Sequence, residues 1–440
     1  MYCGDEIAAI VGDVGSHTAK FGYAGEDQPK HVYSSVVGEP GEQDAAPSKQ
    51  KEACTEERWG SPSFGSLIPH SWCTSRRLVG DLKIGQPRGN TELRSPLKDG
   101  VVEDWDQLES LWDHAFQNCL GADPSERPVL CAQASWSCEK QQERLMELMF
   151  ETFNVPAMYV AKSGMLSAFA AGRTTALVCE CGHGSLSVVP VVEGYVMGKA
   201  LQRGVRGGAW LTQQVAHHVT TKGVQLQPRY AAGRAYDVGK LPANLHESFA
   251  DFHRTEIARD LKETCLAVPL KQGDNVCGEV AEAIGGSCYE LPDGTKIQLT
   301  PELCGIGGAV FAPSESCGQS APVAGQGSSN NGGLVDKAFG ELVHSALAQS
   351  DGDSRKELAS NLVLTGGGSL LRGMPERLTQ DAARDLPTSV KLRVLAGGCI
   401  ERKFGVWIGG SILSSLGTFQ QLWLSKAEYG EYRPKPSAVA

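Results

Sequence analysis

Two stretches, AAIVGDVGSHTAKFGYAGE (residues 8–26) and ALVCECGHGSLSVVPVVEGY (residues 176–195), follow one plan. Each begins with an apolar run that ends at an acid, Asp13 or Glu180, and continues through a Gly-containing turn into a second strand-like run and a Gly-Tyr pair. A strand–turn–strand pattern predicts a β-hairpin, whose turn can direct backbone N–H groups at an anion. This weak internal repeat therefore predicts two similar domains that each contribute one hairpin.

The turn of the first hairpin carries the donors that a phosphate group needs. Residues 15–18 (Gly, Ser, His, Thr) form the turn and Lys20 follows, so backbone N–H groups, hydroxyls and an ammonium group lie close together. A hairpin of this kind is more often a plain turn when it stands alone. The second copy, in residues 180–185, favours a phosphate site.

A glycine-rich segment, LVLTGGGSLLRGMPERL (residues 362–378), is a third candidate part of the site. Its strand ends before Gly366, Gly367 and Gly368, which allow the backbone to approach a ligand closely, and a helical pattern follows. The alternative is a flexible loop.

A polar helical face is the fourth candidate part. In RTEIARDLKETCLAV (residues 254–268), Arg259, Lys262 and Glu263 have the spacing i, i+3 and i+4 and share one face of a helix. The alternative is a solvated charged face. Two phosphate-type hairpins, a glycine-rich turn and this face together predict a nucleotide cleft between two domains.

The rest of the chain alternates strand-like and helical patterns, which predicts an α/β fold. Apolar spacing of three and four predicts helices over 105–119, after Asp104 as N-cap, and over 145–153, and a further helix over 407–426. Two polar stretches without periodicity, residues 39–58 and 312–333, are predicted surface loops.

Composition excludes several classes of protein. The chain has 440 residues, 41% of them hydrophobic, and a net charge of −10, without the long apolar run of a membrane span or a basic cluster for non-specific DNA binding. The first 30 residues do not have the pattern of a secretory signal.

None of the 14 cysteines has C-x-x-C spacing, which favours buried thiols over a zinc site. Cys179 and Cys181 alternate in one strand and should face the same side.

Longer segments resemble the actin superfamily across nearly the whole chain. GYAGEDQP (22–29), MFETFNVPAMYVA (149–161), YELPDGT (289–295) and VWIGGSILSSLGTFQQLWLSKAEY (406–429) look like actin segments in the actin order. Within the superfamily the chain is most similar to the nuclear actin-related protein 4 group. That likeness rests on GSHT in the first turn, SPLKDGVVEDWD (95–106), and ELCGIGGAVFAPSE (302–315) with its polar insertion.

The resemblance implies an actin-like ATPase fold of the α/β class, with four subdomains around a cleft. Subdomain one would take residues 1–36, 95–170 and 404–440, and subdomain two residues 37–94 with a variable loop. Subdomain three would take 171–206 and 301–403 with the insertion 312–333, and subdomain four 207–300.

The resemblance also implies ATP as the ligand, with Mg²⁺ or Ca²⁺ near Asp13 and Glu180. The positions that it assigns to nucleotide binding are Asp13, Gly15, Ser16, His17, Thr18, Lys20, Glu180, Gly182, His183, Gly184, Gly208, Arg259, Lys262, Glu263, Gly366, Gly367, Gly368, Leu371 and Lys403.

The hydrolytic residues depart from the actin pattern. Ser163 and Ser187 stand where actins position the attacking water with glutamine and histidine, and Glu180 replaces an aspartate that helps to hold the metal ion. Phosphoryl transfer depends on positioning that water, so we expect weak or absent ATPase activity and assign no catalytic residue. His183 replaces an acid and is either a phosphate donor or, the favoured interpretation, a surface turn residue.

The resemblance further implies a nuclear protein, with some in the cytoplasm, that acts in chromatin remodelling, histone acetyltransferase complexes and transcription regulation. Its expected partners are actin and a long helix of a remodelling or scaffold subunit, without strong direct DNA binding, a membrane or self-polymerisation. The competing hypothesis is an active ATPase or filament-forming cytoskeletal protein. A sugar kinase or heat-shock-type chaperone is disfavoured, because the actin-like segments would be unexplained.

Overall fold

A computed structural model describes residues 8–41, 77–232, 241–242, 244–271, 273–313, 333–384, 386–387 and 390–432. Two large β-sheets organise this part of the chain. The first is six-stranded in the order β19-β9-β8-β1-β2-β3. Its strands are β1 (Ile10–Val14), β2 (Thr18–Tyr23), β3 (His31–Ser34), β8 (Val129–Gln133), β9 (Ala157–Lys162) and β19 (Leu424–Ser425).

The second sheet repeats the plan of the first. It runs β16-β13-β11-β10-β17-β18, with β12 paired to β11. Its strands are β10 (Ala176–Cys181), β11 (Leu186–Val192), β12 (Tyr195–Val196), β13 (Gln202–Gly204), β16 (Leu334–Val335), β17 (Leu362–Thr365) and β18 (Val394–Ala396). In each sheet the first hairpin is antiparallel and its first strand pairs in parallel with a later strand, β1 with β8 and β10 with β17. The predicted internal repeat is confirmed.

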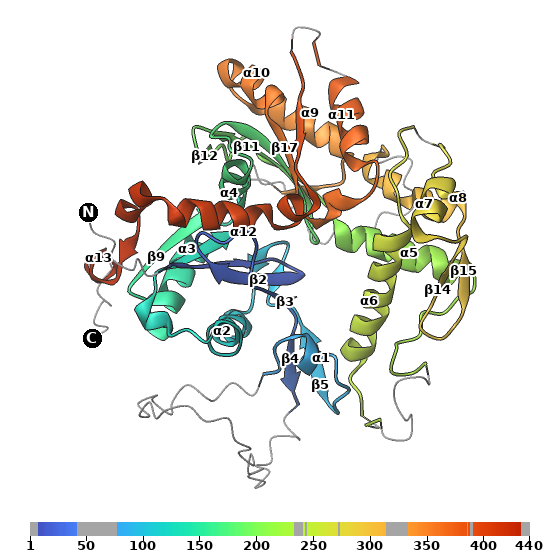
Figure 1. Cartoon of the computed structure of the whole chain (residues 1–440), viewed down its shortest axis with the longest axis horizontal. Coiled ribbons are helices and arrows are strands. Elements are labelled where there is room, and N and C mark those ends of the chain that lie inside the picture. The colour runs from blue at the N-terminus through green and yellow to red at the C-terminus, as the bar shows by residue number, and fades with distance from the viewer. Residues whose placement is uncertain are drawn as a thin grey trace.

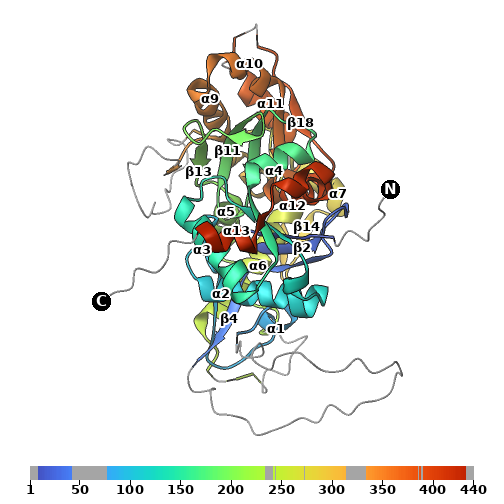
Figure 2. The same ribbon diagram turned by 90° about the vertical axis from the view of Figure 1, so that its left-hand side faces the viewer.

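Helices cover both sheets (Figures 1 and 2), and three small strand pairs lie outside them. The helices are α1 (Asp81–Ile84), α2 (Trp105–His114), α3 (Glu139–Glu147), α4 (Ser163–Ala170), α5 (Gly208–Thr221), α6 (Glu247–Cys265), α7 (Cys277–Ile284), α8 (Pro301–Cys304), α9 (Phe339–Gln349), α10 (Gly352–Ser360), α11 (Met374–Arg384), α12 (Cys399–Ser415) and α13 (Lys426–Tyr432). The small pairs are β4 (Val37–Pro40) with β5 (Thr91–Arg94), β6 (Leu97–Lys98) with β7 (Val101–Val102), and β14 (Cys288–Glu290) with β15 (Lys296–Gln298). Figures 1 and 2 both show α9 to α11 at one end of the molecule, β4 and α1 at the other, and α12 between them.

The two halves meet where α4 packs against α12. A Cβ atom added at Gly409 would lie 1.9 Å from the carbonyl oxygen of Leu166, so only glycine allows this approach of one helix backbone to the other. The indole of Trp407 is fully buried and donates to the carbonyl oxygen of Val11 at 3.0 Å. The helix that follows β18 therefore packs on the first sheet as well.

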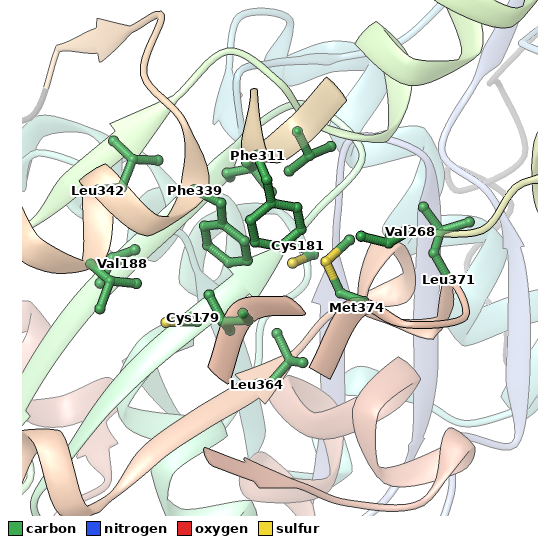
Figure 3. Packing of buried hydrophobic residues seen from close by; sticks show 14 of the residues in the cluster. Cys179, Cys181, Val188, Val268, Phe311, Phe339, Leu342, Leu364, Leu371 and Met374 are labelled. Atoms are coloured by element: carbon green, nitrogen blue, oxygen red, sulfur yellow. The ribbon is translucent and has the colours of Figure 1, made fainter. Parts of the chain in front are cut away.

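Two hydrophobic clusters form the main cores of the halves. In the first, Phe21, Trp112 and Phe116 pack between the first sheet and α2. The second lies behind the other hairpin, and Figure 3 shows Cys179 and Cys181 of β10 facing Phe339 of α9 and Met374 of α11. Both thiols belong to this cluster, so the prediction that they face one side is confirmed.

The helical predictions are confirmed in part. Asp104 caps α2 by accepting from the backbone N–H of Gln107 at 3.0 Å, and π-helical turns continue α2 over Ala115–Leu120 and α3 over Leu148–Thr152. The prediction of one helix over 407–426 is wrong. The helix ends at Ser415, and a 3-10 turn over Gly417–Gln421 buries Phe419 before the chain enters β19.

The two predicted loops lie mostly outside the described residues, which exclude 42–76 and 314–332. At the start of the first stretch, Glu39 lies in β4 and pairs with Arg77 at 2.9 Å, so this end is strand rather than loop. Among the described residues, no helix has the length and apolar character needed to cross a membrane.

Candidate functional site

An open cleft of about 510 Å³ lies where the turns of the two hairpins face each other. It is lined from four directions: by the two turns, by the glycine-rich segment after β17, by the side of α6, and by the start of α12. All of the positions predicted for nucleotide binding line it, from Asp13 to Lys403. The structure thus brings together residues that are up to 390 positions apart in the chain.

The two turns have the same hydrogen-bond geometry. In the first, the N–H of Gly15 donates to the carbonyl oxygen of Thr18 at 3.0 Å, and in the second Gly182 donates to Ser185 at 3.1 Å. Asp13 pairs across the first hairpin with Lys20, and their side chains form an ion pair of 2.7 Å. In both turns, small residues and polar groups line the cleft, as the sequence predicts.

The start of α5 holds the second turn in place. The N–H of Gly208 donates to the carbonyl oxygen of Gly182 at 2.9 Å, and that of Ala209 donates to His183 at 2.7 Å. A Cβ atom added at Gly207 would lie 2.6 Å from the backbone nitrogen of Ser185. Two N–H groups at this helix N-terminus, where partners are needed, are therefore satisfied by the turn.

The glycine-rich segment turns sharply against the second hairpin. Gly366 has a φ of +92°, and a Cβ atom there would lie 2.5 Å from the carbonyl oxygen of Cys181. The conformation and the close approach both require glycine. Arg402 supports the turn by donating to the carbonyl oxygen of Ser369 at 2.7 Å, while its own carbonyl oxygen accepts from Gly366 at 2.7 Å.

The polar face of α6 is a network of ionic side chains at the wall of the cleft. Arg259 binds Glu256 and lies 3.3 Å from Glu263. Lys262 is 8% exposed and donates to the carbonyl oxygen of Gly208 at 3.3 Å. Burial lowers the pKa of Lys262. The interpretation as a solvated charged face is therefore wrong for Lys262, which points into the protein.

Glu180 lies at the floor of the cleft among serine hydroxyls. Its Oε2 accepts from Ser187 at 2.9 Å and from Ser163 at 3.4 Å, whereas its Oε1 is buried and has no hydrogen-bond partner among the described residues. Burial raises the pKa of this carboxyl, and the hydroxyl donors of Ser187 and Ser163 oppose that shift. The two serines thus bind Glu180.

The resemblance implies a divalent cation near Asp13 and Glu180, and these carboxylates could help to hold one. Mg²⁺ in nucleotide sites is bound by one or two carboxylates together with substrate phosphates, and it keeps several waters. Lys20 contacts Oδ2 of Asp13, and Ser187 and Ser163 contact Oε2 of Glu180, so Oδ1 of Asp13 and the unpartnered Oε1 of Glu180 are left for such an ion. Within the described ranges, no three His, Cys, Asp or Glu side chains form a group that could hold a metal ion by themselves. We derive no step through a metal ion.

The imidazoles of His17 and His183 stack on each other across the cleft. Their ring centroids are 4.8 Å apart and their planes are inclined by 25°. Burial and nearby cations lower the pKa of His17 to about 4 and that of His183 to about 3. The favoured interpretation of His183 as a surface turn residue is wrong, because the ring is half-buried and faces the other hairpin.

Several residues of the cleft were not predicted. Glu256 is the closer partner of Arg259, and its i−3 spacing on the same helix could have indicated it. Trp136 lines the cleft beneath the guanidinium of Arg203, 4.1 Å from its ring centroid, and carries no local sequence signal. A separate cavity of about 680 Å³ between α8, α9 and α11 contains none of the predicted positions.

Comparisons with known proteins agree with the geometry. The family described as Actin matches residues 4–439. Actin-related protein 4 of Arabidopsis thaliana is 37% identical over 98% of both chains, and that of Oryza sativa subsp. indica is 39% identical over 98% of both. Actin-related protein 4 of Yarrowia lipolytica is 32% identical over 98% of this chain and 95% of its own.

Proposed function

The chain belongs to the actin family, and from that premise we propose that it is an ATP-binding structural subunit of nuclear assemblies with weak or absent ATPase activity. The observation that carries this proposal is that the hydroxyls of Ser163 and Ser187 donate hydrogen bonds to Glu180. At the two positions where the resemblance calls for residues that position water, Ser163 and Ser187 bind a carboxylate instead. Losing such positioning groups reduces phosphoryl transfer by orders of magnitude.

Nucleotide binding itself is supported by the rest of the cleft. The two hairpin turns have equivalent backbone hydrogen bonds and suit phosphate groups. The glycine turn at Gly366 lets a planar group such as a nucleotide base approach the backbone closely. Lys20, Lys262, Arg259 and Lys403 supply positive charge around it. We propose that these groups bind and orient ATP while the chain performs little or no chemistry on it.

The partner assignment rests on the family and on a few exposed apolar side chains. We propose that the protein pairs with actin and binds a long helix of a scaffold subunit in chromatin-remodelling and histone acetyltransferase complexes, in the nucleus. Tyr195 of β12, Ile412 of α12 and Leu416, which directly follows α12, are exposed apolar side chains, and both β12 and α12 contact α4. Exposed apolar side chains of this kind suit the apolar face of a helix.

The four-subdomain division remains a proposal. Its boundaries after residues 36, 94, 170, 206 and 300 fall between elements, whereas the boundary after 403 falls inside α12.

Purification of the full chain from its native source under mild conditions tests the proposal. We expect actin and a scaffold subunit to copurify, about one ATP per chain, phosphate release at least about tenfold slower than that of actin, and no pellet on sedimentation with ATP and Mg²⁺. Phosphate release at actin's rate, or filaments in the pellet, would favour the competing hypothesis.

A further inference from the structure

Two cysteine side chains meet where α7 packs against α8, at a place that does not line the nucleotide cleft (Figure 1). Cys277 is the first residue of α7 and Cys304 is the last residue of α8. Both belong to a small apolar cluster with Ala267, Val276 and Val280. The two cysteines are 27 positions apart in the chain, so no local spacing in the sequence indicates that they form a pair.

The two thiols are in direct contact. A hydrogen bond joins the side chains of Cys277 and Cys304, and both thiols are free in the structure. Burial, the neighbouring Cys277 and this hydrogen bond all raise the pKa of Cys304. A hydrogen bond that raises the pKa of a thiol favours its protonated form, so Cys304 donates its S–H and the Sγ of Cys277 accepts. Thiols that touch across two packed helices are close to the geometry that a disulfide requires.

The two thiols differ in their access to solvent. Cys277 is half-buried, whereas Cys304 is fully buried. A dissolved reagent therefore reaches Cys277 first, and Cys304 can be reached only by the sulfur of Cys277 beside it. Thiol–disulfide exchange within a protein uses this arrangement of one attacking thiol and a second thiol that resolves the intermediate.

We propose that Cys277 and Cys304 form a reversible disulfide by exchange with a small-molecule disulfide such as oxidised glutathione. This inference is independent of the proposed nucleotide binding. The thiolate of Cys277 attacks one sulfur of the small disulfide, whose S–S bond breaks, and the leaving thiolate takes up the proton that Cys277 released. The sulfur of Cys304 then attacks the Sγ of Cys277 in the mixed disulfide, and the second small thiolate leaves with the proton of Cys304. Two protein thiols are thereby oxidised, and one small disulfide is reduced to two thiols.

The disulfide would close the segment 277–304, which contains α7, β14, β15 and α8. An isolated pair of strands such as β14 and β15 is only marginally stable, and a cross-link around it lowers the entropy of the unfolded segment. The backbone N–H of Ala267, just after α6, donates to the carbonyl oxygen of Cys304 at 2.9 Å. Pro301 and Glu302 of α8 line the cavity between α8, α9 and α11. Oxidation would therefore fix one wall of this cavity and its connection to α6.

Peptide mapping of the full chain tests the proposal. The folded protein is incubated with oxidised glutathione at pH 8, the remaining thiols are alkylated, and tryptic peptides are identified by mass spectrometry. We expect a bridge between the peptide 272–296 and the peptide 297–337, assigned to Cys277 and Cys304 by fragmentation and lost after treatment with dithiothreitol. The oxidised protein should melt about 3–5 °C above the reduced protein.

Two variants make the test specific. In Cys277→Ser, which changes only a half-buried side chain, the bridge and the difference in melting temperature should both disappear. The matched control is Cys288→Ser, which removes a half-buried cysteine of β14 from the same tryptic peptide and should keep both. Should Cys277→Ser not fold, Cys277→Ala takes its place.

Three results would overturn the proposal. The first is an oxidised, folded protein without the bridge, or with Cys277 bound only to glutathione. The second is a bridge that persists in the Cys277 variant or disappears in Cys288→Ser, because it then belongs to another cysteine. The third is a bridge that forms as readily in denaturant as in the folded protein, because the fold then does not direct it.

Discussion

The contact at Gly409 allows a prediction with a definite magnitude. In Gly409→Ala the new Cβ atom would lie 1.9 Å from the carbonyl oxygen of Leu166, 2.5 Å from its carbonyl carbon and 2.9 Å from its Cα. Real Cβ atoms essentially never approach closer than 3.0 Å, so α12 must shift away from α4 by about 1.1 Å. The obstacle is backbone, which cannot rotate aside as a side chain can.

The expected change in unfolding free energy follows from two opposing effects. Overpacking in a buried contact destabilises by about 1–3 kcal/mol and sometimes more, and here it lies at the upper end because a whole helix must move. Alanine gains about 1 kcal/mol over glycine in a helix. We therefore expect a net loss of about 2 kcal/mol.

Chemical denaturation and thermal melting measure this loss. The matched control is Gly278→Ala in α7, where a Cβ atom would meet nothing within 4 Å, and where we expect a gain of about 0.5–1 kcal/mol. Because α12 also carries Lys403 into the cleft, Gly409→Ala should weaken ATP binding as well. If Gly409→Ala melts at or above the wild-type temperature, the backbone contact between α4 and α12 does not exist as described.

Three further predictions concern two charged groups and the positions that would hold the attacking water. Burial raises the pKa of Glu180, so the stability that the protonated carboxyl contributes is present at acid pH and is lost as the pH rises through this raised pKa. Glu180→Gln should therefore have a higher unfolding free energy than the wild type at pH 8 but not at pH 4. An equal increase in unfolding free energy at both pH values would contradict this. Arg206 is fully buried and forms an ion pair with Asp336 at 2.6 Å. Asp336→Asn should therefore lower the unfolding free energy, measured by denaturant titration, by about 2–4 kcal/mol. An unchanged unfolding free energy would show that the ion pair does not stabilise the fold. Ser163→Gln/Ser187→His should raise phosphate release by about tenfold or more if these positions govern the attacking water, and an unchanged rate would show that hydrolysis is limited elsewhere.

The parts of the fold that were predicted correctly are those with local signals. The two hairpins follow from an apolar run, a glycine turn and a second apolar run, all within about twenty residues. The sharp turn at Gly366 and the shared face of Arg259 and Glu263 likewise depend on neighbours in sequence. These four parts together predicted one cleft between two domains, and the resemblance supplied the individual positions assigned to nucleotide binding.

The parts that were missed depend on partners far away in the chain. The chain leaves the helix after Ser415 because Phe419 packs on Tyr159 and Leu424 pairs with Met158, although the apolar spacing continues past that point. Nothing near Glu180 in sequence reveals that Ser163, from the preceding helix, donates to it. The stacking of His17 on His183 joins residues 166 positions apart, and so escapes any local pattern.

The burial of Trp407 against the first sheet bears on the biosynthesis of the protein. The core that contains Val11 and Leu130 is completed only by side chains of α12 and the turn after it. At about 5–20 residues per second, a ribosome needs roughly 10 to 50 seconds to extend the chain from the end of α4 to the end of α12. During that time the nascent first sheet exposes the apolar face that Trp407 later covers, and transiently exposed apolar surface of this kind makes a folding chain prone to aggregation.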